Sequence, residues 1–181
     1  MRIEVRLAGR GGQGLILAGI ILAEGVGVYE GKYVVQTQNY GPEARGGSSR
    51  SDVIIADEEI YFPHCRQVSV LACLSQESYN DYYDSLEEGG VILLDEFYVR
   101  EFTRSPAPIV LPFSQISRKE LGRELFANVI TLGTISRILS TRYDLCRLES
   151  LAEALARRVP GDYLAQNLRA LEIGYNLIEK I

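Results

Sequence analysis

The sequence predicts an α/β fold: a mostly parallel, twisted sheet with helices on both faces and a helical C-terminal region. Short apolar or β-branched runs alternate with amphipathic segments over roughly the first 110 residues. A glycine-rich turn joins the first of these runs to an almost unbroken apolar helix, and about the last sixty residues carry only helical patterns. No linker, repeat or low-complexity tract interrupts the chain, so we expect residues 1–181 to form a single domain.

The individual elements follow from periodicity and from the residues that bound each run. Strands are predicted at 3–8, 33–37, 52–55, 68–74, 91–94 and 109–111. Helices are predicted at 14–26, 77–86, 119–125, 129–139, 148–158 and 163–178. An acidic turn follows the strand at 52–55, so we expect this strand to pair antiparallel at an edge of the sheet. Ser117 and Glu120 have the spacing of a capping box, Gly89-Gly90 is a helix stop signal, and Asp162 is placed to cap the last helix.

Composition and charge limit the kind of partner. The chain is 46% hydrophobic and 24% charged, as in soluble globular proteins. Its longest apolar run, 15–23, is too short to cross a bilayer, and no signal peptide is recognised, so we expect a cytoplasmic protein without a membrane partner. The net charge of −5 argues against nucleic acid. Residues 1–50 nevertheless carry a balance of +2, mostly from arginine, which suits phosphate and carboxylate. We therefore expect any anion-binding region in the first third.

The thiols and the one histidine do not form a metal site. Cys65, Cys73 and Cys146 lack C-x-x-C spacing and are too few to ligate an iron–sulfur cluster, so we expect them to be buried or inert. His64 has no second histidine or carboxylate at ligand spacing, and we interpret it as a loop residue. No nucleophile stands beside a base in the pattern, and Asp95, which ends a strand, is interpreted as a cap or turn residue. We therefore predict no metal ligand and no catalytic residue.

Two further groups of side chains have ordinary structural interpretations. Arg2 and Arg6 on the first strand are expected to be solvated edge charges. Tyr79, Tyr82 and Tyr83 follow the period of an amphipathic helix and are expected in the core or in an interface.

Two glycine-rich, arginine-bearing segments are the candidate anion site. Glycines let the backbone approach an anion, free N–H groups at a helix start favour negative charge, and arginine provides two-pronged contacts. The candidate binding residues are Arg10, Gly11, Gly12, Gln13 and Gly14 in the first segment, and Tyr40, Glu43, Arg45, Gly46, Gly47, Ser48 and Arg50 in the second. An alternative remains open, in which Gly46-Gly47 is only a turn and Glu43 with Arg45 only stiffens a subunit contact.

The first segment also satisfies the dinucleotide pattern, which makes the predicted fold Rossmann-like. Gly9, Gly11 and Gly14 form G-x-G-x-x-G between a strand and a helix. A dinucleotide site also requires a carboxylate at the end of the second strand, to hold the ribose hydroxyls. That strand ends in Gln36-Thr37-Gln38 instead. NAD, NADP and FAD are therefore disfavoured, and a stand-alone nucleotide-binding Rossmann-like protein is kept as an alternative.

Taken together, three motifs resemble a known family. They are GRGGQG at 9–14, the stretch QTQNYGPEARGGSSRSDVIIADEEI at 36–60, and LSQESY at 74–79. The chain resembles the gamma subunit of 2-oxoacid:ferredoxin oxidoreductases over nearly its whole length. YGPEARGG is more similar to the 2-oxoglutarate branch than to the pyruvate or indolepyruvate branches, which remain alternatives.

The resemblance implies a division of labour between subunits. Alpha and beta subunits, with a delta subunit in some members, would hold thiamine diphosphate and the iron–sulfur clusters. The complex would convert a 2-oxoacid and coenzyme A to acyl-CoA and carbon dioxide while reducing ferredoxin. This chain would hold no cofactor, help to form the coenzyme A side of the active site, and be inactive when isolated. We expect the isolated chain to expose apolar surface and to be able to form a homodimer. A purely structural assembly protein without a ligand is the remaining alternative.

Overall fold

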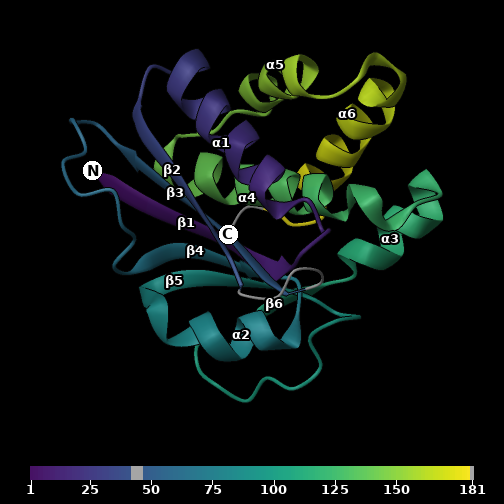
Figure 1. The fold of residues 1–181 in the computed structure, drawn as a ribbon, viewed down its shortest axis with the longest axis horizontal. Helices are drawn as coiled ribbons and strands as arrows, with labels where there is room; N and C mark the ends of the chain where they lie inside the picture. Colours follow the sequence, from purple (N-terminus) through teal and green to yellow (C-terminus); the bar gives the residue numbers. More distant parts are fainter. Residues whose placement is uncertain (42–46, 180–181) are drawn as a thin grey trace.

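The computed structural model describes residues 1–41 and 47–179 and contains a six-stranded mixed sheet in the order β2-β3-β1-β4-β5-β6 (Figure 1). Its strands are β1 (Arg2–Arg10), β2 (Tyr33–Tyr40), β3 (Ser48–Ala56), β4 (Val68–Cys73), β5 (Leu86–Asp95) and β6 (Ile109–Leu111). β1, β4, β5 and β6 are parallel neighbours, whereas β3 runs antiparallel to both β1 and β2. The predicted fold class is confirmed.

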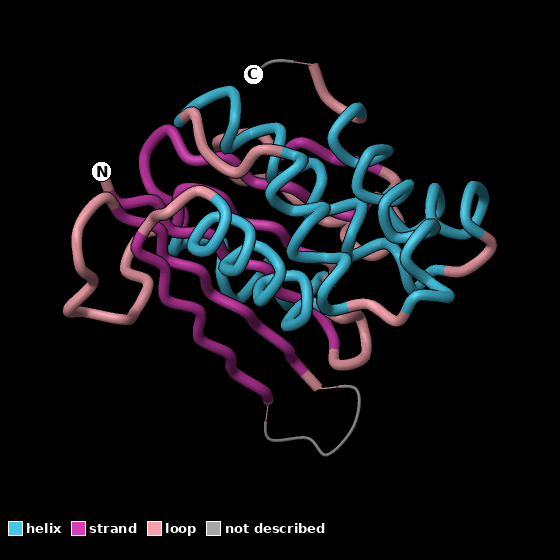
Figure 2. The backbone as a smooth tube through the Cα atoms, turned by 90° about the horizontal axis from the view of Figure 1, so that it is seen from above, coloured by secondary structure: helices cyan, strands magenta, loops and turns pink. Residues whose placement is uncertain are grey.

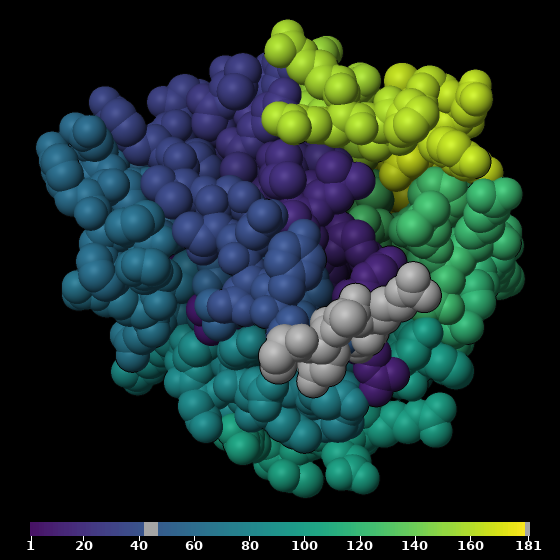
Figure 3. Space-filling view, in the orientation of Figure 1, coloured from purple at the N-terminus to yellow at the C-terminus, as the bar shows by residue number. Residues whose placement is uncertain are grey.

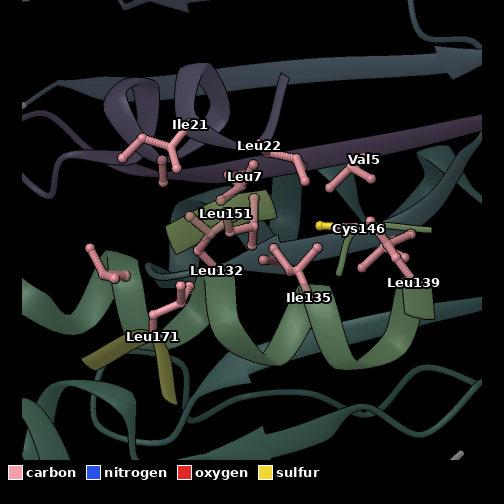
Figure 4. Close-up of a cluster of buried hydrophobic side chains, with 14 of the residues drawn as sticks. Val5, Leu7, Ile21, Leu22, Leu132, Ile135, Leu139, Cys146, Leu151 and Leu171 are labelled. Carbon is pink, nitrogen blue, oxygen red and sulfur yellow. The ribbon is translucent and has the colours of Figure 1, made fainter. Parts of the chain in front are cut away.

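One face of the sheet carries the larger core. It is covered by α1 (Leu15–Tyr29), α4 (Ala127–Tyr143) and α5 (Leu148–Arg158), which Figure 1 labels on the side of the sheet opposite α2; Figure 2 shows helices lying over the strands. Alternate residues of β1, such as Val5 and Leu7, point into this layer, where Figure 4 shows them with Ile21 of α1 and Ile135 of α4. All four side chains are fully buried, and each such burial contributes about 1.5–3 kcal/mol.

The opposite face carries a smaller core under α2 (Gln76–Tyr82), which is followed by the 3₁₀ turn η1 (Tyr83–Ser85). Tyr79 and Tyr83 are buried there, with their rings in an edge-to-face contact at 5.4 Å. Tyr82 is partly buried against the same cluster. The prediction that these three tyrosines pack into the core or an interface is confirmed.

The helical C-terminal region is also confirmed. After β6 come α3 (Phe113–Leu121) and the 3₁₀ turn η2 (Glu124–Phe126), and the chain ends with α6 (Gly161–Asn176). α6 crosses α4 closely at two glycines, because a Cβ on Gly174 would overlap the carbonyl of Ile130 and one on Gly133 that of Leu171. The Thr134 hydroxyl also joins the two helices by donating a hydrogen bond to the Gly174 carbonyl at 2.8 Å. None of the helices in the described part of the chain is long and apolar enough to span a membrane.

Several local predictions are wrong. β3 begins at Ser48 and lies between β1 and β2, so it is not an edge strand. The predicted helix at 77–86 is shorter, and Gly89 and Gly90 belong to β5 because Leu86 already pairs with Val68 of β4.

The two predicted caps at later helices are also wrong. Ser117 lies inside α3, with its hydroxyl donating to the Arg123 carbonyl at 2.5 Å. Asp162 lies in the first turn of α6, whose N-cap is Pro160. In both cases the helix begins earlier than the local pattern indicated.

Candidate functional site

The two glycine-rich segments meet at the carboxyl end of β1. β1 ends at Arg10, residues 11–14 form the turn, and α1 begins at Leu15. The Gly11 N–H donates to the Gly47 carbonyl at 2.7 Å, and on the hairpin the Gly41 N–H donates to the Ser48 carbonyl at 2.7 Å. Segments that are far apart in the sequence therefore form one rim. Glu43, Arg45 and Gly46 lie outside the described residues.

Gln13 and Gly14 hold the turn in shape. The Gln13 side chain accepts from the Arg10 N–H at 2.7 Å and donates to the Leu74 carbonyl at 2.9 Å, so it ties the turn to the end of β4. Gly14 has a left-handed backbone (φ 72°), and a Cβ there would overlap the Asn128 side chain. Asn128 in turn donates to the Gly14 carbonyl at 2.9 Å. α1 begins without a side-chain cap, so its first N–H groups remain available to an anion.

A cleft of about 240 Å³ opens beside this turn, at the carboxyl ends of the parallel strands. Its walls come from the β1–α1 turn, the ends of β4 and β5, and the starts of α3 and α4. The lining residues are Gly12, Gln13, Leu74, Asp95, Tyr98, Ser114, Glu124, Leu125 and Ala127. In the space-filling view, the purple N-terminal segment reaches the surface between the green and teal parts of the chain (Figure 3). Such edges of α/β sheets commonly bind ligands.

The cleft presents carboxylates instead of arginines. Asp95 is buried, with one oxygen accepting from the Ser114 N–H at 2.7 Å and the other from the Phe97 N–H at 2.9 Å. It therefore caps α3 and fixes a turn, as predicted. The Tyr98 hydroxyl donates to Glu124, and this hydrogen bond raises the pKa of Tyr98. Because two carboxylates face the cleft, its interior suits an uncharged or donor-bearing group better than a phosphate.

Arg10 and Arg50 lie on the other face of the sheet, beside α2. Arg10 donates to Glu77 at 2.8 Å; this hydrogen bond raises the pKa of Arg10 and lowers that of Glu77. Arg50 lies 3.4 Å from Asp52 and stacks over the Tyr82 ring at 5.2 Å. Arg50 lies outside the predicted strand at 52–55, and this boundary is wrong, because Arg50 belongs to β3 and pairs with Ala8 of β1.

Strand alternation gathers four polar residues on this α2 side. In register, Ser48 lies opposite Arg10 on β1, and Asn39 on β2 lies opposite Arg50. We call Arg10, Asn39, Ser48 and Arg50 the arginine patch. Arg10, Asn39 and Ser48 are exposed and Arg50 is half-buried. Tyr40 points to the α1 side instead and is 63% exposed.

Arg6 is buried, so the prediction that it is a solvated edge charge is wrong. β1 lies inside the sheet, so Arg6 is buried and makes two bonds to Asp52, at 2.7 and 2.9 Å, and one to Ser85 at 3.0 Å. Burial alone would lower the pKa of Arg6, but the bonds to Asp52 outweigh it and raise the pKa. Arg2 is exposed, as expected of a solvated charge, and it also donates to the buried Glu4 at 2.8 Å. The buried pair holds the Asp52 carboxylate in place beneath Arg50.

The family model of the pyruvate ferredoxin/flavodoxin oxidoreductases matches residues 4–177. The chain belongs to this family. The resemblance seen in the sequence is thereby confirmed.

Two relatives are similar to the chain over all or nearly all of its length. The 2-oxoglutarate synthase subunit KorC of Methanocaldococcus jannaschii is 40% identical, covering 100% of this chain and 96% of its own. A solved structure, the keto/oxoacid ferredoxin oxidoreductase gamma subunit of Geobacter sulfurreducens, is 37% identical with a TM-score of 0.82 and covers 96% of each chain. The fold thus agrees with that of a gamma subunit in this family.

A more distant solved structure shares the fold. The 2-oxoglutarate:ferredoxin oxidoreductase of Magnetococcus marinus, solved with 2-oxoglutarate, coenzyme A and succinyl-CoA bound, is 23% identical with a TM-score of 0.78. The match covers 99% of this chain but 32% of that one. In that protein, the fold is therefore part of a longer polypeptide.

The sequence analysis did not predict most of the residues that line the cleft. Tyr98, Ser114, Glu124, Leu125 and Ala127 come from connections and helix starts that follow β5 and β6. The available signal was their place in the chain, because segments that follow parallel strands gather at the carboxyl edge. Their mutual contacts, such as that of Tyr98 with Glu124, join residues too far apart for any local pattern to indicate.

Proposed function

We propose that the chain is the gamma subunit of a 2-oxoglutarate:ferredoxin oxidoreductase and forms part of the coenzyme A side of its active site. The observation that carries this proposal is the full-length similarity, in both directions, to KorC of Methanocaldococcus jannaschii. The pyruvate synthase subunit PorC of Methanothermobacter marburgensis is 30% identical, against 40% for that KorC, which favours 2-oxoglutarate over pyruvate.

Thiamine diphosphate and the iron–sulfur clusters belong, in this proposal, to the alpha and beta subunits. The positions of the thiols support this division. Cys73 packs in the core under α2, whereas Cys146 packs in the core on the other side of the sheet. A cluster requires about four thiolates converging on one point, and these two face opposite ways. Burial also raises the pKa of Cys73 and of Cys65, each to about 12, which disfavours the thiolate form that binds metal.

Coenzyme A would use both sides of the rim. Its phosphates require N–H groups and arginines, which the 11–14 turn and the arginine patch provide. The Arg10–Glu77 pair is about half exposed at both ends, so an incoming phosphate can replace the carboxylate at little cost. The carboxylate-bearing cleft would take an uncharged part of the molecule. Glu43, Arg45 and Gly46, which lie between Gly41 and Gly47 in the sequence, remain proposed binding residues.

Reconstitution tests the proposal. We expect the chain expressed alone to fold, to lack iron and thiamine, and to show no oxidoreductase activity. Added to its alpha and beta partners, it should restore coenzyme A-dependent reduction of ferredoxin with 2-oxoglutarate, and much less with pyruvate. Full activity of the partners without this chain would contradict the proposal, and so would a preference for pyruvate.

A further inference from the structure

β2 is an unprotected edge of the sheet. Among residues 1–41 and 47–179 it pairs only with β3, in unbroken register from Tyr33 to Tyr40. Its sequence, YVVQTQNY, carries no charge and no proline. Figure 2 shows the strands of the β2–β3 pair extending past the helices. Edge strands are usually protected by charges, prolines or bulges, because their free backbone groups otherwise pair with another chain.

The register shows which backbone groups of β2 face outward. Gly41 lies opposite Ser48 and donates to its carbonyl at 2.7 Å, so this is a hydrogen-bonded pair. In an antiparallel ladder such pairs alternate, and the odd-numbered residues of β2 therefore bond to β3. The N–H and C=O groups of Val34, Gln36, Gln38 and Tyr40 point away from β3.

Exposed apolar side chains lie at the two ends of β2 and at the end of α1. Val28 at the end of α1 is 64% exposed, Tyr33 is 52% exposed and Tyr40 is 63% exposed. α1 lies against β2 here, since a Cβ on Gly27 would be 3.4 Å from the Val34 side chain. The edge thus combines free backbone groups with apolar surface, as association surfaces do.

We propose that β2 pairs antiparallel with β2 of a second copy of this chain, about a two-fold axis at Thr37. With that axis, Val34 meets Tyr40 and Gln36 meets Gln38, each twice, giving about eight backbone hydrogen bonds. An axis at Gln36 would leave Tyr40 unpaired. A neutral strand suits a copy of itself, because no like charges are opposed and no partner charge goes unanswered. The two sheets become one continuous sheet. Tyr40, a candidate coenzyme A-binding residue at the end of β2, would also take part in this interface.

Cysteine cross-linking tests the register. Thr37 would face Thr37 in a non-hydrogen-bonded pair, whose Cα atoms lie about 4.5 Å apart, within the range of a disulfide. Mild oxidation of full-length Thr37→Cys should give a covalent dimer within minutes. Tyr61→Cys, at an 85% exposed loop position, is the matched control and should cross-link at least about tenfold more slowly. Equal rates for the two variants would overturn the proposal.

Sedimentation of the full chain tests the interface at equilibrium. The unmodified chain and Thr37→Val should form dimers, whereas Thr37→Lys, which opposes two ammonium groups, should be monomeric. Gln38→Pro should also be monomeric, because it removes an outward N–H and leaves the β2–β3 bonds intact. Circular dichroism checks that each variant folds. A strictly monomeric unmodified chain would overturn the proposal, as would dimers of Thr37→Lys, or a Thr37→Cys that cross-links only to a catalytic subunit in the assembled complex.

Discussion

Arg10→Ala should weaken the use of coenzyme A selectively. The Arg10 side chain is 52% exposed, and its partner Glu77 is 59% exposed. Losing such a surface ion pair costs about 0–1 kcal/mol of stability, so the variant should fold and assemble. A charge-assisted hydrogen bond to phosphate contributes about 1.5–3 kcal/mol. Removing it should raise the apparent KM for coenzyme A roughly ten- to a hundredfold and change that for 2-oxoglutarate little.

Steady-state kinetics of the assembled complex, with each substrate varied separately, measures this effect. Arg104→Ala is the matched control, because Arg104 is 43% exposed and is also paired with a carboxylate, Asp84, at 2.9 Å, but lies outside the arginine patch. Arg104→Ala should leave both KM values unchanged. Equal losses for both substrates in Arg10→Ala, or the same effect in both variants, would refute the proposed phosphate contact and support a role in subunit contact only.

Three further predictions concern stability. Arg6→Met should lower the free energy of unfolding by about 3–5 kcal/mol in urea titrations, because it leaves Asp52 buried with only the weaker Arg50 contact; a loss below about 1 kcal/mol would contradict this. Gly174→Ala should lower the melting temperature by at least several degrees, whereas Gly161→Ala, where a Cβ meets nothing within 4 Å, should not; equal melting temperatures would show that α4 and α6 can separate freely. Stability should fall as pH rises from about 9 towards 12, because the Cys65 and Cys73 thiols, with a pKa of about 12, stay protonated in the folded chain but ionise when unfolded. Cys73→Ala should reduce that slope by about 1.4 kcal/mol per pH unit, and an unchanged slope would count against the burial effect.

The sequence predicts well what local patterns determine. Alternating apolar residues in β1, the glycine turn and the apolar α1 follow one another without a break, so the strand, the turn and the helix could all be placed. The resemblance of the motifs identified the family, and the strand–helix alternation gave the class of fold.

Predicting the face of the sheet on which each arginine lies required knowledge of contacts between distant parts of the chain. The run NYGPEARGGSSR is rich in glycine and polar residues and indicates a loop, but Ser48 and Arg50 become part of β3 by pairing with β1 and β2. Once a strand is taken for a loop, its alternation is lost, and the side of the sheet cannot be assigned. The prediction that Arg6 is a solvated edge charge was wrong for a related reason, since only the strand order shows that β1 is interior.

Helix starts depended on distant partners in the same way. Asp95 caps α3 from the end of β5, nineteen positions earlier in the chain, so the start at Phe113 had no local capping signal. The cleft residues Tyr98 and Glu124 also meet only through the tertiary fold.

Photo-cross-linking of coenzyme A to the assembled oxidoreductase tests most directly that this chain forms the coenzyme A side of the site. An analogue with a photoreactive group near its phosphates should label this chain at residues 9–14 and 39–50, and excess coenzyme A should abolish the label. Labelling confined to the alpha and beta subunits, with none on this chain, would contradict the account.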